Sequence, residues 1–235
     1  MNGRRVLDIE YQLLPGTERK TTDIVIERNG AVVVHPAKNL SPEKVDDVVE
    51  SKRLWIYRNL AEWRDLNATA VIREWVNGET FLYLGRAYRL SLVADQSVDL
   101  KLQDGRFCLN RSLIDKSGVS AAKAAFENYY SENGLRRIKA RVSYFAPKVG
   151  VNPKATLVRE LGYRWATCNS EGVLSFHWKC MMATPNVIDY LVVHELCHIH
   201  HRNHSDAFWN EVDKILPDYR ERKSWLKKHG AALDL

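Results

Sequence analysis

Apolar and polar positions in the first third of the chain predict strands followed by a helix. Residues 22–28 and 31–35 are rich in β-branched residues and flank an Asn-Gly pair at 29–30, which is a strong hairpin signal. A long helix is then expected from Ser41 to about Asp65, because Ser is a good N-cap and the proline after it suits the first helical position.

The middle of the chain predicts a second group of strands and then two helices. Four short β-rich runs are separated by turn residues, and they span residues 81–84, 88–93, 99–102 and 106–109. Two helices are expected near residues 120–133 and 135–146. Gly134 lies between them and is expected to act as a C-cap.

The last third predicts a hairpin and three helices. The hairpin pairs residues 156–167 with residues 173–178. Thr184 and the proline after it then begin an apolar helix, Ser205 caps a second helix, and Pro217 begins the last one.

Composition is that of a packed globular protein. At 235 residues, with 45% apolar residues and seven tryptophans, the chain is large enough for a real core. Its four cysteines form no C-x-x-C pair or disulfide framework, the N-terminus lacks the apolar segment of a signal peptide, and no run is long enough to span a membrane. We therefore expect a cytoplasmic protein with no membrane partner.

The chain is basic, with a formal net charge of +6, and its cations cluster at residues 136–141 and 220–229. A surface that faces nucleic acid is one interpretation. The helical spacing of Leu135, Ile138 and Val142 favours solvated helix faces instead, and no nucleic-acid motif accompanies the charge. DNA or a DNA-bound protein is therefore the less favoured partner.

The candidate chemistry lies in the helix that begins after Thr184. His194, Glu195 and His198 form the pattern H-E-x-x-H. Side chains four residues apart lie on one face of a helix, so both imidazoles can reach one metal ion. Glu195 flanks them, where a general base would act on a water molecule. The alternative is a histidine-rich helix end without a metal, and the apolar helix that leads into the motif favours the metal site.

A third ligand is expected after the helix. His204 lies ten residues after His194, within reach of a loop, and imidazole is a preferred zinc donor. The alternative is a carboxylate on a following helix, either Glu211 or Glu221. Asn203 in the left-handed conformation would supply the reversal that brings His204 back. Three neutral imidazoles favour Zn²⁺ with a water in the fourth position.

These parts predict a zinc-dependent metallopeptidase that hydrolyses peptide bonds through a metal-bound water. Zinc lowers the pKa of its water to about 7 and polarises a carbonyl. Glu195 would take the proton and deliver it to the leaving nitrogen. Tyr190 and Tyr163 are candidates for the donor to the oxyanion. The alternatives are a metal-dependent hydrolase of a non-peptide amide and a nucleic-acid-associated protein with a structural metal.

Several motifs surround the histidines: R-W-A-T-C at 164–168, Trp178, the run 187–198, H-x-N-H-S at 201–205, Phe208-Trp209, and Leu84-Gly85-Arg86 in the N-terminal block. Together they resemble the YgjP-like metallopeptidase domain. The resemblance implies a zincin-type α+β domain in which His194, His198 and His204 bind zinc and Glu195 is the base. It also implies kinship with the SprT and WLM groups, whose members cleave proteins crosslinked to DNA.

One position departs from the family's pattern, because the usual R-W-G-S-C is R-W-A-T-C here and Ala166 replaces a glycine. If this stretch forms a substrate-facing edge strand, as zincins generally have, the change narrows the approach of a peptide. The spacing of the histidines also matches metzincins. Metzincins have a glycine three residues after the second histidine, however, and this position is His201 here. No Met-turn follows either, so we do not assign the chain to that group.

The expected fold is therefore α+β. A strand-rich N-terminal region with one long helix, residues 1–115, precedes a zincin-like core, residues 116–235, which carries a β-hairpin and the H-E-x-x-H helix. The two regions are expected to pack as one unit, and the expected partner is a peptide or protein substrate.

Overall fold

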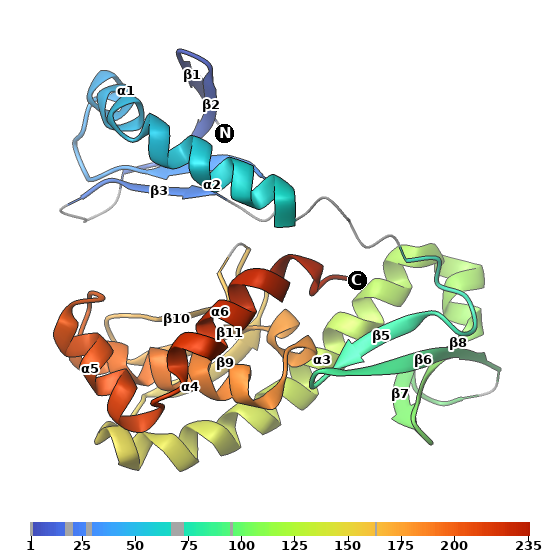
Figure 1. Ribbon diagram of the computed structural model, residues 1–235. Helices are drawn as coiled ribbons and strands as arrows, with labels where there is room; N and C mark the ends of the chain where they lie inside the picture. Colours follow the sequence, from blue (N-terminus) through green and yellow to red (C-terminus); the bar gives the residue numbers. More distant parts are fainter. Residues whose placement is uncertain (1, 17–20, 27–29, 67–72, 95, 163) are drawn as a thin grey trace. The chain divides into compact units, whose positions relative to one another are not determined.

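The computed structural model describes residues 2–16, 21–26, 30–66, 73–94, 96–162 and 164–235 (Figure 1). The chain forms two compact units, Met1–Thr69 and Ala70–Leu235. The predicted α+β class is confirmed. The division predicted between residues 115 and 116 falls inside the second unit, because the strands before it and the helix after it share one hydrophobic core.

The first unit contains a four-stranded sheet in the order β1-β2-β4-β3. Its strands are β1 (Asn2–Val6), β2 (Ile9–Leu13), β3 (Asp23–Ile26) and β4 (Val32–His35). β3 and β4 pair antiparallel, as the Asn-Gly hairpin predicts, although Asn29 lies outside the described residues. The β1–β2 hairpin was not predicted. It turns through Leu7, whose φ is 52° without a glycine to signal it.

The long helix predicted for this unit is divided at Lys52. α1 (Pro42–Ser51) and α2 (Arg53–Leu66) meet at this residue, whose φ and ψ are −99° and 8°. Ser41 is the N-cap, as predicted, and its side chain accepts a hydrogen bond from the Lys44 N–H. The buried core of this unit consists of Ile9, Tyr11, Val32, Val34, Val45, Val49 and Ile56.

The second unit begins with a sheet in the order β5-β6-β8-β7. Its strands are β5 (Thr80–Tyr83), β6 (Arg86–Val93), β7 (Leu100–Gln103) and β8 (Arg106–Asn110), close to the predicted runs. The β5–β6 turn uses Gly85, where an added Cβ would lie 2.5 Å from Cγ2 of Thr184. Leu84 and Gly85 also donate hydrogen bonds to the carbonyls of Met181 and Met182. The turn is thereby fastened to the segment that leads into the motif helix.

α3 (Arg111–Val149) follows the sheet and runs through Gly134 without a break, so the predicted C-cap is wrong. Gly134 is buried, and an added Cβ would lie 3.0 Å from Cγ of Met181. The glycine therefore permits close packing inside a helix. The helical path is interrupted at Gly118 instead, where φ is 73°.

The predicted last hairpin is a three-stranded sheet in the order β10-β11-β9. Its strands are β9 (Ala155–Arg159), β10 (Ala166–Cys168) and β11 (Val173–His177), and a 3₁₀ segment, η1 (Trp178–Met182), follows. β10 pairs antiparallel with β11, whereas β9 pairs parallel with it. β10, which contains part of the R-W-A-T-C motif, is therefore an edge strand.

Three helices complete the unit: α4 (Pro185–His200), α5 (Asp206–Ile215) and α6 (Tyr219–His229), before a short 3₁₀ turn, η2 (Gly230–Ala232). Thr184 and Ser205 occupy the N-cap positions of α4 and α5, as predicted, and α6 begins two residues after Pro217. α4 packs on α3, where Arg141 donates hydrogen bonds of 2.6 and 2.8 Å to Asp189. In the described part of the chain, no helix has the length and apolarity needed to cross a membrane.

Candidate active site

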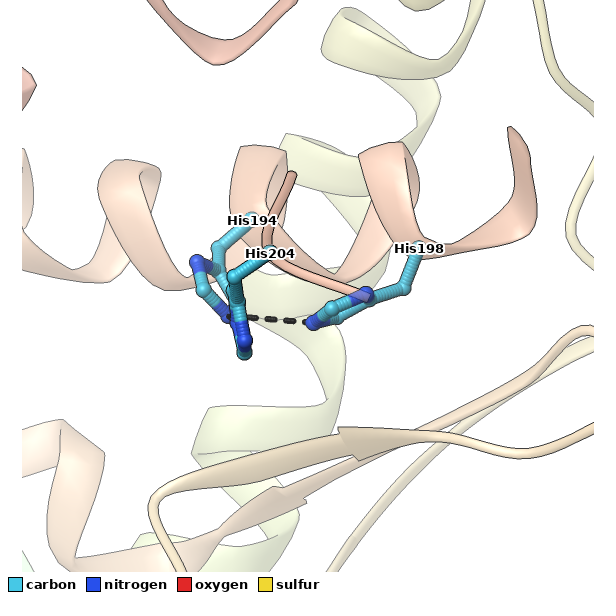
Figure 2. A group of neighbouring side chains, drawn as sticks. All are labelled: His194, His198 and His204. Atoms are coloured by element: carbon cyan, nitrogen blue, oxygen red, sulfur yellow. Dashed lines mark hydrogen bonds between the residues drawn. The ribbon is translucent and has the colours of Figure 1, made fainter. Parts of the chain in front are cut away.

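Three histidines converge beside the C-terminal half of α4 (Figure 2). His194 and His198 come from one face of this helix, and His204 reaches them from the loop before α5. Nε2 of His194 lies 3.2 Å from Nε2 of His198 and 3.0 Å from Nε2 of His204. The structure thus brings together the three histidines that the sequence singled out.

The ring nitrogens are arranged as a metal ion requires. Nδ1 of His198 lies 2.9 Å from the His201 carbonyl oxygen and so donates its proton there, which leaves a lone pair on Nε2. Nitrogens bound about 2.0–2.1 Å from one tetrahedral zinc lie about 3.3 Å apart, close to the separations seen here. The buried Nδ1 of His194 has no hydrogen-bond partner among the described residues. Without a metal, a proton on one Nε2 can be donated to a neighbouring Nε2. Once that proton is released, three lone pairs point to one place, and this donor set fits a zinc ion.

Burial favours the neutral form of all three imidazoles. It lowers the pKa of His194 well below the usual value, and the positive charge that His198, His204 and Lys223 can carry lowers that pKa further. Burial is also the largest cause of the lowered pKa of His198 and of His204. A metal ion needs the neutral imidazole, so the surroundings favour the binding form.

A carboxylate that the sequence offered as an alternative ligand lies against the end of α4. Glu211 lies 2.8 Å from Nδ1 of His200 and 3.0 Å from Nε2 of His201. The group of converging metal donors in the described chain includes neither Glu211 nor Glu221. Asn203, predicted to be left-handed, is not among the described residues with positive φ.

Aromatic rings of α5 and α6 support the histidines. The Phe208 ring is buried, and its centroid lies 4.6–4.9 Å from the centroids of all three imidazoles. Trp209 stacks on His204 with centroids 5.5 Å apart, and on its other neighbour, Tyr219, with centroids 5.3 Å apart. The sequence pattern predicts no separate role for these rings. Phe208 and Trp209 follow His204 by only four and five residues, and this closeness in the sequence is the signal that could have identified them.

Glu195 is buried next to the histidines, with 4% of its surface exposed. Burial raises the pKa of its carboxyl to about 8, and the positive charge of Arg164 opposes this shift. A cavity of about 800 Å³ is lined by Glu195 and His194, by residues 164–166 at β10, and by one face of α6. A substrate in this cavity would contact both the carboxylate and the histidine cluster.

Of the two tyrosines predicted as candidate oxyanion donors, Tyr190 lies among the described residues. Tyr190 lines the cavity, and its ring centroid lies 5.7 Å from that of His194. It is 4% exposed, and burial raises the pKa of its hydroxyl. Tyr163 lies outside the described residues.

The family model described as "YgjP-like, metallopeptidase domain" matches residues 20–229, which is most of the chain. The chain belongs to the YgjP-like metallopeptidase family. The resemblance read from the motifs is thereby confirmed, and membership supports a metal-dependent hydrolase that acts on peptides or proteins.

Two further comparisons add little to this assignment. The YgjP-like chain is similar to the crystal structure of the metallopeptidase zymogen of Pyrococcus abyssi abylysin, with 20% identity, coverage of 38% of this chain and 90% of that chain, and a TM-score of 0.36. No curated protein matches the chain.

Proposed function

We propose that this YgjP-like protein is a zinc-dependent peptidase whose active site consists of His194, His198, His204 and Glu195. The observation that carries the proposal is the convergence of three Nε2 atoms beside a buried carboxylate that lines the same cavity. Three imidazoles that leave one position open form a common ligand set of catalytic zinc sites.

Each residue has a defined role in this proposal. The three histidines would hold the metal, which when bound lowers the pKa of a water to about 7 and polarises the scissile carbonyl. Glu195 takes a proton from the attacking water and delivers it to the leaving amine nitrogen. Because Glu195 is buried, its carboxylate is shielded from bulk water and exchanges protons with the reactants in the cavity.

The edge strand β10 supplies a means of holding an extended peptide. It pairs with β11 on one side, and Ala166 lines the cavity. An extended chain can add to the free edge of a sheet through main-chain hydrogen bonds. The methyl group of Ala166, where the family pattern has glycine, narrows this approach and restricts how closely a substrate backbone can lie.

The role of Glu195 is tested by Glu195→Gln. The amide cannot accept the proton, so kcat should fall about 10²–10⁴-fold while the zinc content stays unchanged. Glu221→Gln, on α6 and outside the cavity, is the matched control and should retain both properties. Unchanged turnover in Glu195→Gln would remove the general-base role. Assays with peptides beside small amides separate a peptidase from a hydrolase of non-peptide amides.

A further inference from the structure

Four cations line the cavity beside the histidine cluster. Among the described residues that line it, the cations are Arg164, Arg220, Lys223 and Lys227, and Glu195 is the only carboxylate. Cations that line one concave surface add their potentials and raise the local concentration of an anionic ligand.

Helical spacing explains why α6 contributes three of these cations. The α6 residues that line the cavity are 219, 220, 223, 224, 226 and 227, which recur at the period of one helix face. Arg222 and Lys228 do not line the cavity, and Arg222 instead binds Asp218 at 2.9 Å and the Asn186 carbonyl at 3.0 Å. The basic cluster at residues 220–229, which the sequence assigned to a solvated helix face, is therefore divided between two faces. One of these faces lines the cavity of the candidate active site.

Lys223 is the cation with the clearest relation to the histidines. Its Nζ lies 4.2 Å from the centroid of the Trp209 ring, which stacks on His204. A cation–π contact positions an ammonium without neutralising its charge, so that charge still acts on a ligand. Arg220, in comparison, shares its charge with Asp213 at 3.3 Å.

We propose that the cation-lined wall of this cavity binds a carboxylate of the substrate, and that the enzyme prefers peptides with an acidic residue or a free C-terminal carboxylate close to the scissile bond. The inference rests on the proposed peptidase function. A negative charge in the cavity is attracted by Lys223 and the other three cations, whereas a lysine or arginine there is repelled.

Matched peptides test this preference with the zinc-loaded, full-length protein. Each position on either side of the cleaved bond is given Glu or Gln in turn, and each peptide is made with a free and an amidated C-terminus, so the two sources of carboxylate are separated. At one position, we expect kcat/KM for the carboxylate peptide to be about tenfold higher than for its amide partner. This factor lies between the contribution of an exposed ion pair and that of a hydrogen bond to a charged group.

Two lysine variants assign the effect to the cavity. Lys223→Met keeps an unbranched side chain over Trp209 but removes the charge, so the ratio between carboxylate and amide peptides should fall well below that of the wild type. Lys228→Met, on the same helix but outside the cavity, should leave the ratio unchanged.

Binding without turnover separates failure of this inference from failure of the peptidase function. In Glu195→Gln, fluorescence anisotropy of labelled peptides should show tighter, salt-sensitive binding of the carboxylate form, and adding Lys223→Met should reduce that difference. This result with no cleavage by the wild type would support the carboxylate site and overturn the peptidase alone. Equal rates and affinities for all matched peptides would overturn the inference and leave the peptidase standing. Lys223-dependent binding of duplex DNA with no peptide preference would also overturn it, because the wall would then bind phosphates.

Discussion

Two ring clusters in the second unit are packed alike but differ in their polar atoms. Beneath the β5–β8 sheet, Phe126 lies 4.3 Å from Phe81 and 4.9 Å from Phe107 by ring centroids. The hydroxyl of the adjoining Tyr130 donates a 2.7 Å hydrogen bond to the Leu82 carbonyl. Beside α4, the imidazole centroids lie 4.7–4.9 Å apart, yet their Nε2 atoms face one another.

This difference in polar atoms suggests that one cluster serves the stability of the fold and the other its function. Burial of apolar rings away from water stabilises the folded state without any specific partner. Imidazoles lose hydration when they are buried, and this loss is offset only if their nitrogens find partners. In the histidine cluster the Nε2 atoms have one another as partners, and release of the proton that they share leaves lone pairs that can bind a cation. The aromatic cluster should therefore determine the stability of the chain, and the histidine cluster should determine metal binding.

The largest effect is expected from Phe126→Ala in the aromatic cluster. Phe126 is fully buried, so removal of its ring should cost about 3–5 kcal/mol in the free energy of unfolding, measured by urea denaturation. Zinc bound per folded chain should not change. Val98→Ala, at a side chain that is 48% exposed, is the control and should cost less than about 0.5 kcal/mol. A cost below about 1 kcal/mol for Phe126→Ala would contradict the role of this cluster.

The second effect is the loss of zinc-dependent stabilisation in His198→Ala. Zinc at about 1,000 times its Kd should stabilise the wild type by about 4 kcal/mol, because it binds only the folded chain. Thermal unfolding with zinc and with a chelator measures this gain, which should largely disappear in the variant. His229→Ala, on α6, should retain it. An equal gain in His198→Ala would mean that zinc binds elsewhere.

A smaller effect is expected from Glu211→Ala, which tests how the histidine cluster is supported. Oε2 of Glu211 lies 3.0 Å from Nε2 of His201 and supports the residue whose carbonyl accepts the proton of His198. Loss of this support should weaken zinc binding about 10–100-fold without changing the number of bound ions. Competition with a chelating dye measures the affinity, and Glu221→Ala is the control. Loss of the bound ion itself would instead identify Glu211 as a ligand.

The smallest effect is expected from Tyr130→Phe, which removes only the hydrogen bond to the Leu82 carbonyl. The cost should be about 0.5–1.5 kcal/mol in the free energy of unfolding, with no change in zinc affinity. A measurable loss of zinc affinity in this variant would show that the two ring clusters are coupled.

The sequence predicted the features that depend on local spacing. Residue spacing within short segments predicted the H-E-x-x-H helix and its start at Thr184. It also predicted the four short strands of the β5–β8 sheet. Features that depend on distant contacts were missed. Gly134 looks like a helix end in the sequence, but Met181 packs against it from another element.

The same limit explains what was missed at the site. The basic residues of α6 give no local sign that one face of this helix lies on a cavity, because the other walls come from α4 and β10. The parallel pairing of β9 with β11 is likewise set by contacts between segments that are distant in the chain.

The most direct test of the metal site is the zinc content of the purified full-length protein, measured for the wild type and His204→Ala in parallel after zinc loading and gel filtration. We predict about one zinc ion per wild-type chain and a clear loss in the variant, because Nε2 of His204 completes the donor set. A wild type that neither carries nor gains zinc would contradict a metal site. A variant that keeps its zinc would contradict the assignment of His204 as the third ligand.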